Sequence, residues 1–118
     1  MKYTATVLLL ADRRRSPAAK FLRDSGFRLL TTFTPDHAVA LCVNSNDIRV
    51  AVLDQEHFVT TDNWSVAQSL KMVRRNMCVV LVARGKIVGH TLPEGVDAIV
   101  AERDGASLAK AINKLLDR

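Results

Sequence analysis

Short aliphatic runs alternate with helix-like segments along the whole chain, and this alternation constrains the fold most strongly. The expected strands lie at 4–10, 27–33, 48–53, 77–83 and 97–101. The first and third are nearly continuous in aliphatic residues, which is typical of strands buried on both faces of a parallel sheet. Strands that alternate with helices therefore predict an α/β fold, with a doubly wound parallel sheet covered by helices on both faces.

Cap residues mark where the helices begin and end. Ser16-Pro17 and Thr34-Pro35 each place an N-cap residue before a proline at the first helical position. Gly26 is well placed for a left-handed C-terminal cap. A third helix is expected after the polar residues at 60–63, and a last helix from residue 104 or 107. Between 84 and 96, three glycines and a proline oppose a helix, so the fourth helix should be shortened or irregular.

Composition limits the class of protein. The 118 residues suit one domain spanning 1–118. No apolar run approaches the roughly 20 residues that cross a bilayer, and the first residues lack a secretory cleavage site, so we expect a cytoplasmic protein without a membrane partner. Cys42 and Cys78 lie among apolar residues and fit no zinc spacing, so both are expected to be buried free thiols. The net charge of +5 would favour an anionic partner.

Two of the aliphatic runs end in an aspartate, Asp12 and Asp54. In open α/β sheets the functional crevice lies beyond the carboxyl ends of the strands. The two carboxylates would therefore share one crevice if their strands are neighbours. Of the three arginines that follow Asp12, Arg13 is the one expected to point inward and contact an anion. The alternative is a solvated loop whose arginines pair with nearby carboxylates.

With these five strand–helix units and the two aspartates, the chain resembles the receiver domain of bacterial two-component response regulators over about residues 5–117. The resemblance implies a flavodoxin-like sheet of order 2-1-3-4-5, with Asp12 and Asp54 on adjacent strands. It also implies that Asp54 is the phosphoacceptor. A Mg²⁺ ion would be bound by Asp12, Asp54 and the main-chain carbonyl of Glu56, since hard oxygen ligands suit this ion.

Among the departures from the receiver pattern, three concern the phosphoryl site directly. Receivers normally have a second acidic residue where Ala11 stands. The switch Thr or Ser at the end of the fourth strand is Val82, which cannot donate a hydrogen bond. The lysine after the fifth strand is Glu102, which would repel a phosphoryl group. Because no population shift occurs without a differential contact, the resemblance implies a degenerate receiver, or pseudo-receiver.

The resemblance implies a signalling module of a two-component phosphorelay that is not an enzyme. It would act through a histidine kinase, an output domain or a second copy of itself, either as an altered phosphoacceptor or independently of phosphorylation. The alternative is a basic surface that binds nucleic acid or another anion, although aromatic residues are only 5% and DNA-binding motifs are absent. A metal-dependent phosphate hydrolase built on Asp12, Asp54 and Glu102 has no supporting nucleophile or phosphate-loop motif.

Overall fold

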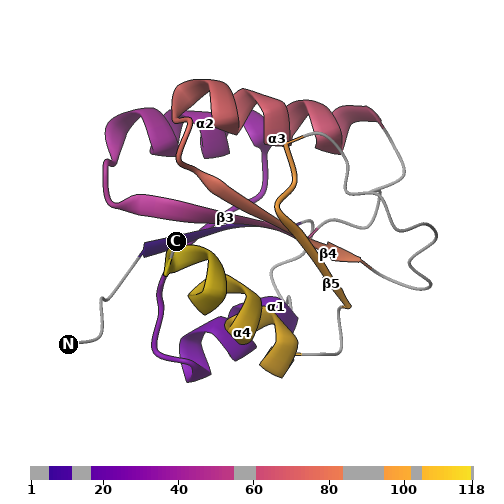
Figure 1. Cartoon of the computed structure of the whole chain (residues 1–118). Helices are drawn as coiled ribbons and strands as arrows, with labels where there is room; N and C mark the ends of the chain where they lie inside the picture. The colour runs from indigo at the N-terminus through magenta and orange to yellow at the C-terminus, as the bar shows by residue number, and fades with distance from the viewer. Residues whose placement is uncertain (1–5, 12–16, 55–60, 84–94, 102–104, 118) are drawn as a thin grey trace.

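The computed structural model describes residues 6–11, 17–54, 61–83, 95–101 and 105–117 (Figure 1). Within these ranges the chain forms a central parallel sheet between two layers of helices. The strands are β1 (Thr6–Ala11), β2 (Arg28–Thr32), β3 (Ile48–Asp54), β4 (Cys78–Ala83) and β5 (Ala98–Ala101). The helices are α1 (Pro17–Asp24), α2 (Pro35–Asn44), α3 (Thr61–Val73) and α4 (Gly105–Leu116).

The sheet has the order β2-β1-β3-β4-β5, and every neighbouring pair is parallel. This confirms the predicted flavodoxin-like order and the predicted adjacency of the first and third strands. Helices α1 and α4 cover one face of the sheet, and α2 and α3 cover the other (Figure 1). The central strands β1 and β3 are therefore buried on both sides, which explains their continuous aliphatic sequences.

Successive residues of each strand alternate between two cores. The α1/α4 core contains the side chains Val7, Leu9, Val52, Val80 and Val82, with Leu22 from α1 and Ile112 from α4. The α2/α3 core contains Leu8, Leu10, Leu53, Val79 and Leu81, with Cys42 from α2 and Leu70 from α3. Because side chains alternate with a period of two, the parity of a strand residue decides which pair of helices it meets.

Two of the predicted caps are present. Gly26 has a φ of 87°, and its N–H donates to the carbonyl of Arg23 while the Phe27 N–H donates to the carbonyl of Leu22. These two bonds form a Schellman motif, which glycine favours because it has no Cβ. At the start of α2, the Thr34 hydroxyl accepts from the N–H of His37 at 3.3 Å. Local sequence therefore sets both of these helix ends.

Arg74, directly after α3, joins that helix to the end of α2. Its guanidinium donates to the carbonyls of Cys42 at 2.7 Å and Ser45 at 2.8 Å, and to those of Asn46 at 3.1 Å and Ile48 at 2.7 Å. The sequence predicts that this arginine favours the C-terminus of its own helix. Arg74 does directly follow the last residue of α3, and its guanidinium in addition donates to the Cys42 carbonyl in the last turn of α2, where carbonyls lack helical partners.

Asp97 ties α3 to the starts of β4 and β5. Its carboxylate oxygen Oδ2 accepts from the ammonium of Lys71 at 2.7 Å and from the N–H of Val79 at 2.8 Å. The N–H of Asp97 in turn donates to the carbonyl of Val79. A half-buried side chain thus fixes one end of each of three elements.

The observed strands lie within two residues of those predicted, and α4 begins at Gly105, between the two predicted starts. The prediction of an irregular fourth helix falls on 84–94, which lies outside the described residues. Cys42 is buried as predicted, whereas Cys78 is only half-buried, and neither forms a disulfide. None of the described helices is both long and apolar enough to cross a lipid bilayer.

Candidate functional site

Asp54 is the last residue of β3, and its side chain is 0% exposed. In the β1–β3 register it pairs with Ala11, the last residue of β1, which is also buried. Parity places both residues on the α1/α4 side of the sheet, at the carboxyl end of its two central strands. Asp54 is the only fully buried carboxylate in the part of the chain that the structure describes.

Val82 lies on the other side of Asp54. Leu53 pairs with Leu81 in the parallel register of β3 and β4, so the next step along both strands brings Asp54 beside Val82. Val82 is 1% exposed and pairs in turn with Val100 of β5. The strand neighbours of the carboxylate on its own face are therefore an alanine and a valine, and neither side chain carries a polar atom.

The chain leaves the sheet in opposite directions around Asp54. From β1 it continues to α1, on one face, and from β3 it continues to α3, on the other face (Figure 1). Adjacent parallel strands whose connections diverge in this way form the topological switch point, and ligands of open α/β sheets bind in the crevice beside it. Asp54 stands at this switch point, and the adjacency of β1 and β3 that places it there is the one implied by the resemblance to receivers.

The other predicted site residues lie outside the described residues. They are Asp12 and Arg13 after β1, Glu56 after β3 and Glu102 after β5. Their predicted proximity to Asp54 stays a prediction. Among the residues that are described, no group of three metal-ligating side chains comes together.

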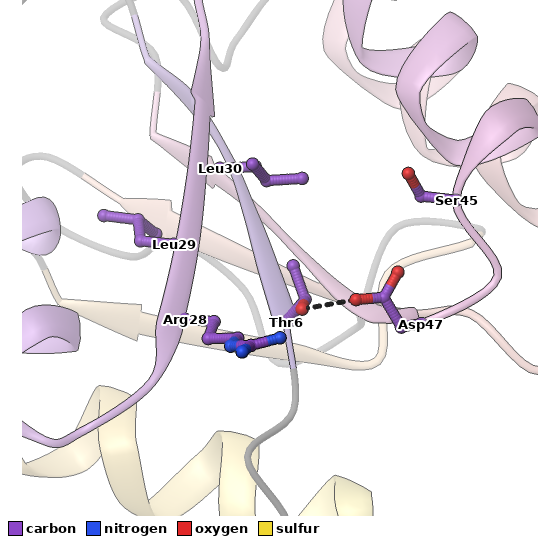
Figure 2. Close-up of a pocket in the computed structure, with 6 residues that line it drawn as sticks. All are labelled: Thr6, Arg28, Leu29, Leu30, Ser45 and Asp47. Atoms are coloured by element: carbon purple, nitrogen blue, oxygen red, sulfur yellow. Dashed lines mark hydrogen bonds between the residues drawn. The ribbon is translucent and has the colours of Figure 1, made fainter.

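A cavity of about 350 Å³ lies at the opposite end of the sheet (Figure 2). It is lined at the starts of β1 and β2 and at the turn before β3, by Thr6, Arg28, Leu29, Leu30, Ser45 and Asp47. The Thr6 hydroxyl donates to the Asp47 carboxylate at 2.7 Å. This hydrogen bond lowers the pKa of Asp47, and the Asp47 backbone and the positive charges of Arg28 and Arg74 act in the same direction.

The Thr6–Asp47 pair anchors the α2–β3 turn to β1 across 41 residues of sequence. The sequence contains no signal for this contact, because neither residue belongs to a motif and each is an ordinary polar residue next to a strand. The cavity has no contact with Asp54, since it lies at the amino ends of the strands. We therefore treat it as a structural anchor and not as part of the candidate site.

No protein-family model and no curated protein sequence matches this chain. Solved structures do match. A response regulator receiver domain protein from Clostridium thermocellum is 17% identical, with a TM-score of 0.79 over 97% of this chain and 95% of that chain. The chain has the receiver fold. A response regulator receiver protein from Sinorhizobium medicae is 23% identical, with a TM-score of 0.71 over 96% and 95% of the two chains.

The receiver fold also occurs in a protein described as pilus assembly-related, from Burkholderia pseudomallei. It is 14% identical, with a TM-score of 0.81 over 99% of this chain and 94% of that chain. Likeness at these identities establishes the fold, and a fold supports more than one activity. The function therefore depends on Asp54 and the residues around it, not on the fold alone.

Proposed function

We propose that this chain is a receiver-type signalling domain of two-component signal transduction that acts through protein–protein contacts. The observation that carries the proposal is the fully buried carboxylate of Asp54 at the switch point between β1 and β3. Burying a carboxylate carries a desolvation cost. The receiver pattern has a carboxylate at this position, so the buried aspartate here supports a receiver-type domain whether or not Asp54 is modified.

The proposed signal does not depend on a phosphorylation switch. A switch requires a contact that forms in only one of two states, because a ligand without differential contacts shifts no equilibrium. Val82, which is buried beside Asp54, offers only methyl groups to a phosphoryl oxygen. Glu102, placed by sequence after β5, would repel a phosphoryl group instead of attracting it. In this proposal the partner recognises the same surface whether or not Asp54 is modified.

A Mg²⁺ ion fits the chemistry of this end of the sheet. Asp54 supplies a hard carboxylate oxygen, whereas its strand neighbours Ala11 and Val82 supply none. The remaining ligands would be the Asp12 carboxylate and the Glu56 carbonyl, as in the receiver pattern. The ion would neutralise charge on a phosphoryl group that reaches Asp54.

Incubation with Mg²⁺ and acetyl phosphate, followed by intact-mass measurement, tests whether Asp54 accepts a phosphoryl group. An adduct that forms on the wild-type protein and not on Asp54→Ala would identify the acceptor. Beryllofluoride with Mg²⁺ then tests for a switch in ¹H–¹⁵N spectra. We expect amide shifts confined to the ends of β1, β3 and β4. Shifts that extend along α4 would refute the proposal that the domain lacks a switch.

A cellular assay tests the signalling role itself. A strain of the source organism that lacks the gene should lose a regulated response, and both the wild-type gene and Asp54→Ala should restore it. Failure of a folded Asp54→Ala protein to restore the response would show that the signal depends on this carboxylate. A deletion strain with every regulated response intact would contradict a signalling role.

A matched pair of valines tests the position of Val82. Val80 and Val82 are both buried on the α1/α4 side of β4, and only Val82 lies beside Asp54. Threonine at Val80 buries a hydroxyl among apolar groups, at a cost of about 1–3 kcal/mol. Threonine at Val82 can instead donate to the Asp54 carboxylate, so Val82→Thr should destabilise the protein less than Val80→Thr. Equal losses in urea unfolding would contradict this placement.

Binding of an anionic ligand is the second candidate function, and the face formed by α1 and α4 favours it. The two helices lie side by side (Figure 1). They expose Lys20, Arg23, Lys110 and Lys114, against Asp24 and Asp117. If this face binds nucleic acid, affinity should fall steeply with salt. An affinity that does not change with salt concentration would exclude this candidate function.

A further inference from the structure

The outer edge of β2 is a sheet edge that another chain can use. β2 pairs in register with β1 from Arg28 to Thr32, and no strand lies on its other side in the described ranges. Such an edge presents a row of unpaired N–H and C=O groups, and proteins usually protect it with charged residues, above all Lys, with Pro or with a bulge. β2 contains no Lys or Pro, its one charged residue is Arg28 at its start, and its pairing with β1 shows no bulge. Its backbone is therefore ready for a further strand.

The edge also exposes apolar side chains. Leu30 is 37% exposed and Phe33, directly after the strand, is 47% exposed. They are two of the four large hydrophobic residues that are exposed in the described part of the chain. The other two, Val43 and Met72, lie on helices α2 and α3. An exposed apolar edge whose one charged residue lies at the end of the strand is a predicted pairing site.

The two ends of this edge carry the same aromatic side chain. Residues 27–33 read Phe-Arg-Leu-Leu-Thr-Thr-Phe, with a phenylalanine three residues to either side of Leu30. We propose that the β2 strands of two copies pair antiparallel about a two-fold axis at Leu30 and join the two sheets into one. Leu30 would then face its own counterpart, and Phe27 would face Phe33 of the second copy. Interfaces of this two-fold kind present the same patch from both subunits.

The proposed register satisfies the backbone as well as the side chains. Alternate residues of a strand direct their N–H and C=O groups to the same edge, so paired positions must both be odd or both be even. In this register Arg28 faces Thr32 and Leu29 faces Thr31, and every pair meets that condition. The aromatic pairs at both ends belong to the cross-strand pairs that stabilise antiparallel sheets.

Charge favours the same register. No charged residue faces a like charge, because Arg28 meets Thr32 of the second copy. Beyond that threonine the second copy begins α2, whose first turn carries the acidic Asp36. In the proposed dimer, each Arg28 therefore lies near the carboxyl end of β2 of the second copy, on the side where Asp36 supplies a negative charge. The net charge of +5 on each copy opposes association, so added salt should tighten the dimer.

The size of the contact sets its expected strength. A single strand edge of seven residues with its flanking side chains buries less than the roughly 800 Å² per partner of a standard stable interface. The dimer should therefore be weak, with a dissociation constant of about 10–100 µM. This association does not depend on Asp54 or on phosphorylation.

Sedimentation velocity of the whole chain from about 1 to about 500 µM measures the association, at concentrations that bracket the expected constant. Leu30→Lys places two ammonium groups across the axis and should weaken the dimer at least about tenfold. Met72→Lys is the matched control, because Met72 is 87% exposed on α3 and receives the same charge away from the edge. A wild-type protein that stays monomeric throughout, or equal weakening by both variants, would overturn the proposal.

Cysteine cross-linking tests the register independently of charge. Antiparallel residues that face each other have Cα atoms about 4.5–5.5 Å apart, within disulfide range. Leu30→Cys should therefore form a disulfide between two copies in oxidised glutathione. Thr31→Cys should not, because it faces Leu29 and its own counterpart is a diagonal neighbour, about 7–8 Å away. Faster cross-linking of Thr31→Cys, or none of Leu30→Cys, would overturn the register.

Discussion

Replacing Arg74 by methionine should be one of the most destabilising single changes outside the cores. The guanidinium donates to four main-chain carbonyls at the end of α2 and the start of β3. A hydrogen bond from a charged donor contributes about 1.5–3 kcal/mol, and the four are not additive because they share one charge. Part of the group is also exposed to solvent. We therefore expect a loss of about 2–4 kcal/mol.

Urea unfolding followed by circular dichroism measures this loss, with the slope against urea unchanged if the unfolded state is unaffected. For a domain of this length, a loss of about 3 kcal/mol corresponds to a fall of about 12 °C in Tm. Arg75→Met is the control, because Arg75 is exposed next to Arg74 and should change stability by less than about 0.5 kcal/mol. Equal effects of the two variants would refute the role given to Arg74.

Three further changes test other contacts. Gly105→Ala should destabilise the protein by about 1–3 kcal/mol, because its Cβ would overlap the Phe21 ring across the α1–α4 contact, and Phe21→Leu should partly rescue it in thermal melts. Thr6→Val should reduce stability near neutral pH, because it removes the hydrogen bond that lowers the pKa of Asp47. The pH-dependent part of this loss should vanish as pH falls well below the ordinary aspartate pKa of 3.8, since Asp47 is then protonated in both the folded and the unfolded protein. A constant difference in urea unfolding across that range would contradict this. Burial raises the pKa of the Cys42 thiol, so its labelling by a disulfide reagent should follow unfolding, and labelling faster than unfolding would contradict its burial.

Local signals in the sequence predicted much of the fold. Thr34 and Gly26 set helix ends through contacts within a few residues, and the aliphatic runs of β1 and β3 reported burial on both faces. The place of Asp54 at the carboxyl end of a buried strand also followed from the sequence. Its position beside β1, at the switch point, followed only from the resemblance to receivers.

Contacts between distant segments could not be predicted in the same way. The carbonyls that Arg74 reaches lie 26–32 residues earlier in the chain, and no pattern connects them to an arginine that follows α3. Cys78 was expected to be buried from its apolar neighbours, yet its place at the start of β4 leaves it half-buried. The two phenylalanines on either side of Leu30 could not be assigned to a sheet edge from the sequence, because only the topology shows that β2 is the outermost strand.

The ion pair of Asp97 and Lys71 determines where the sheet can yield. Asp97, directly before β5, accepts from Lys71 of α3 and from the N–H of Val79 in β4. These two bonds hold the amino ends of β4 and β5 against α3, at the opposite end of the strands from Asp54. We therefore expect any rearrangement that begins at Asp54 to displace the carboxyl ends of these paired strands more than their amino ends. A pair of spectroscopic labels on α3 and at the start of β5 would keep its spacing throughout such a change.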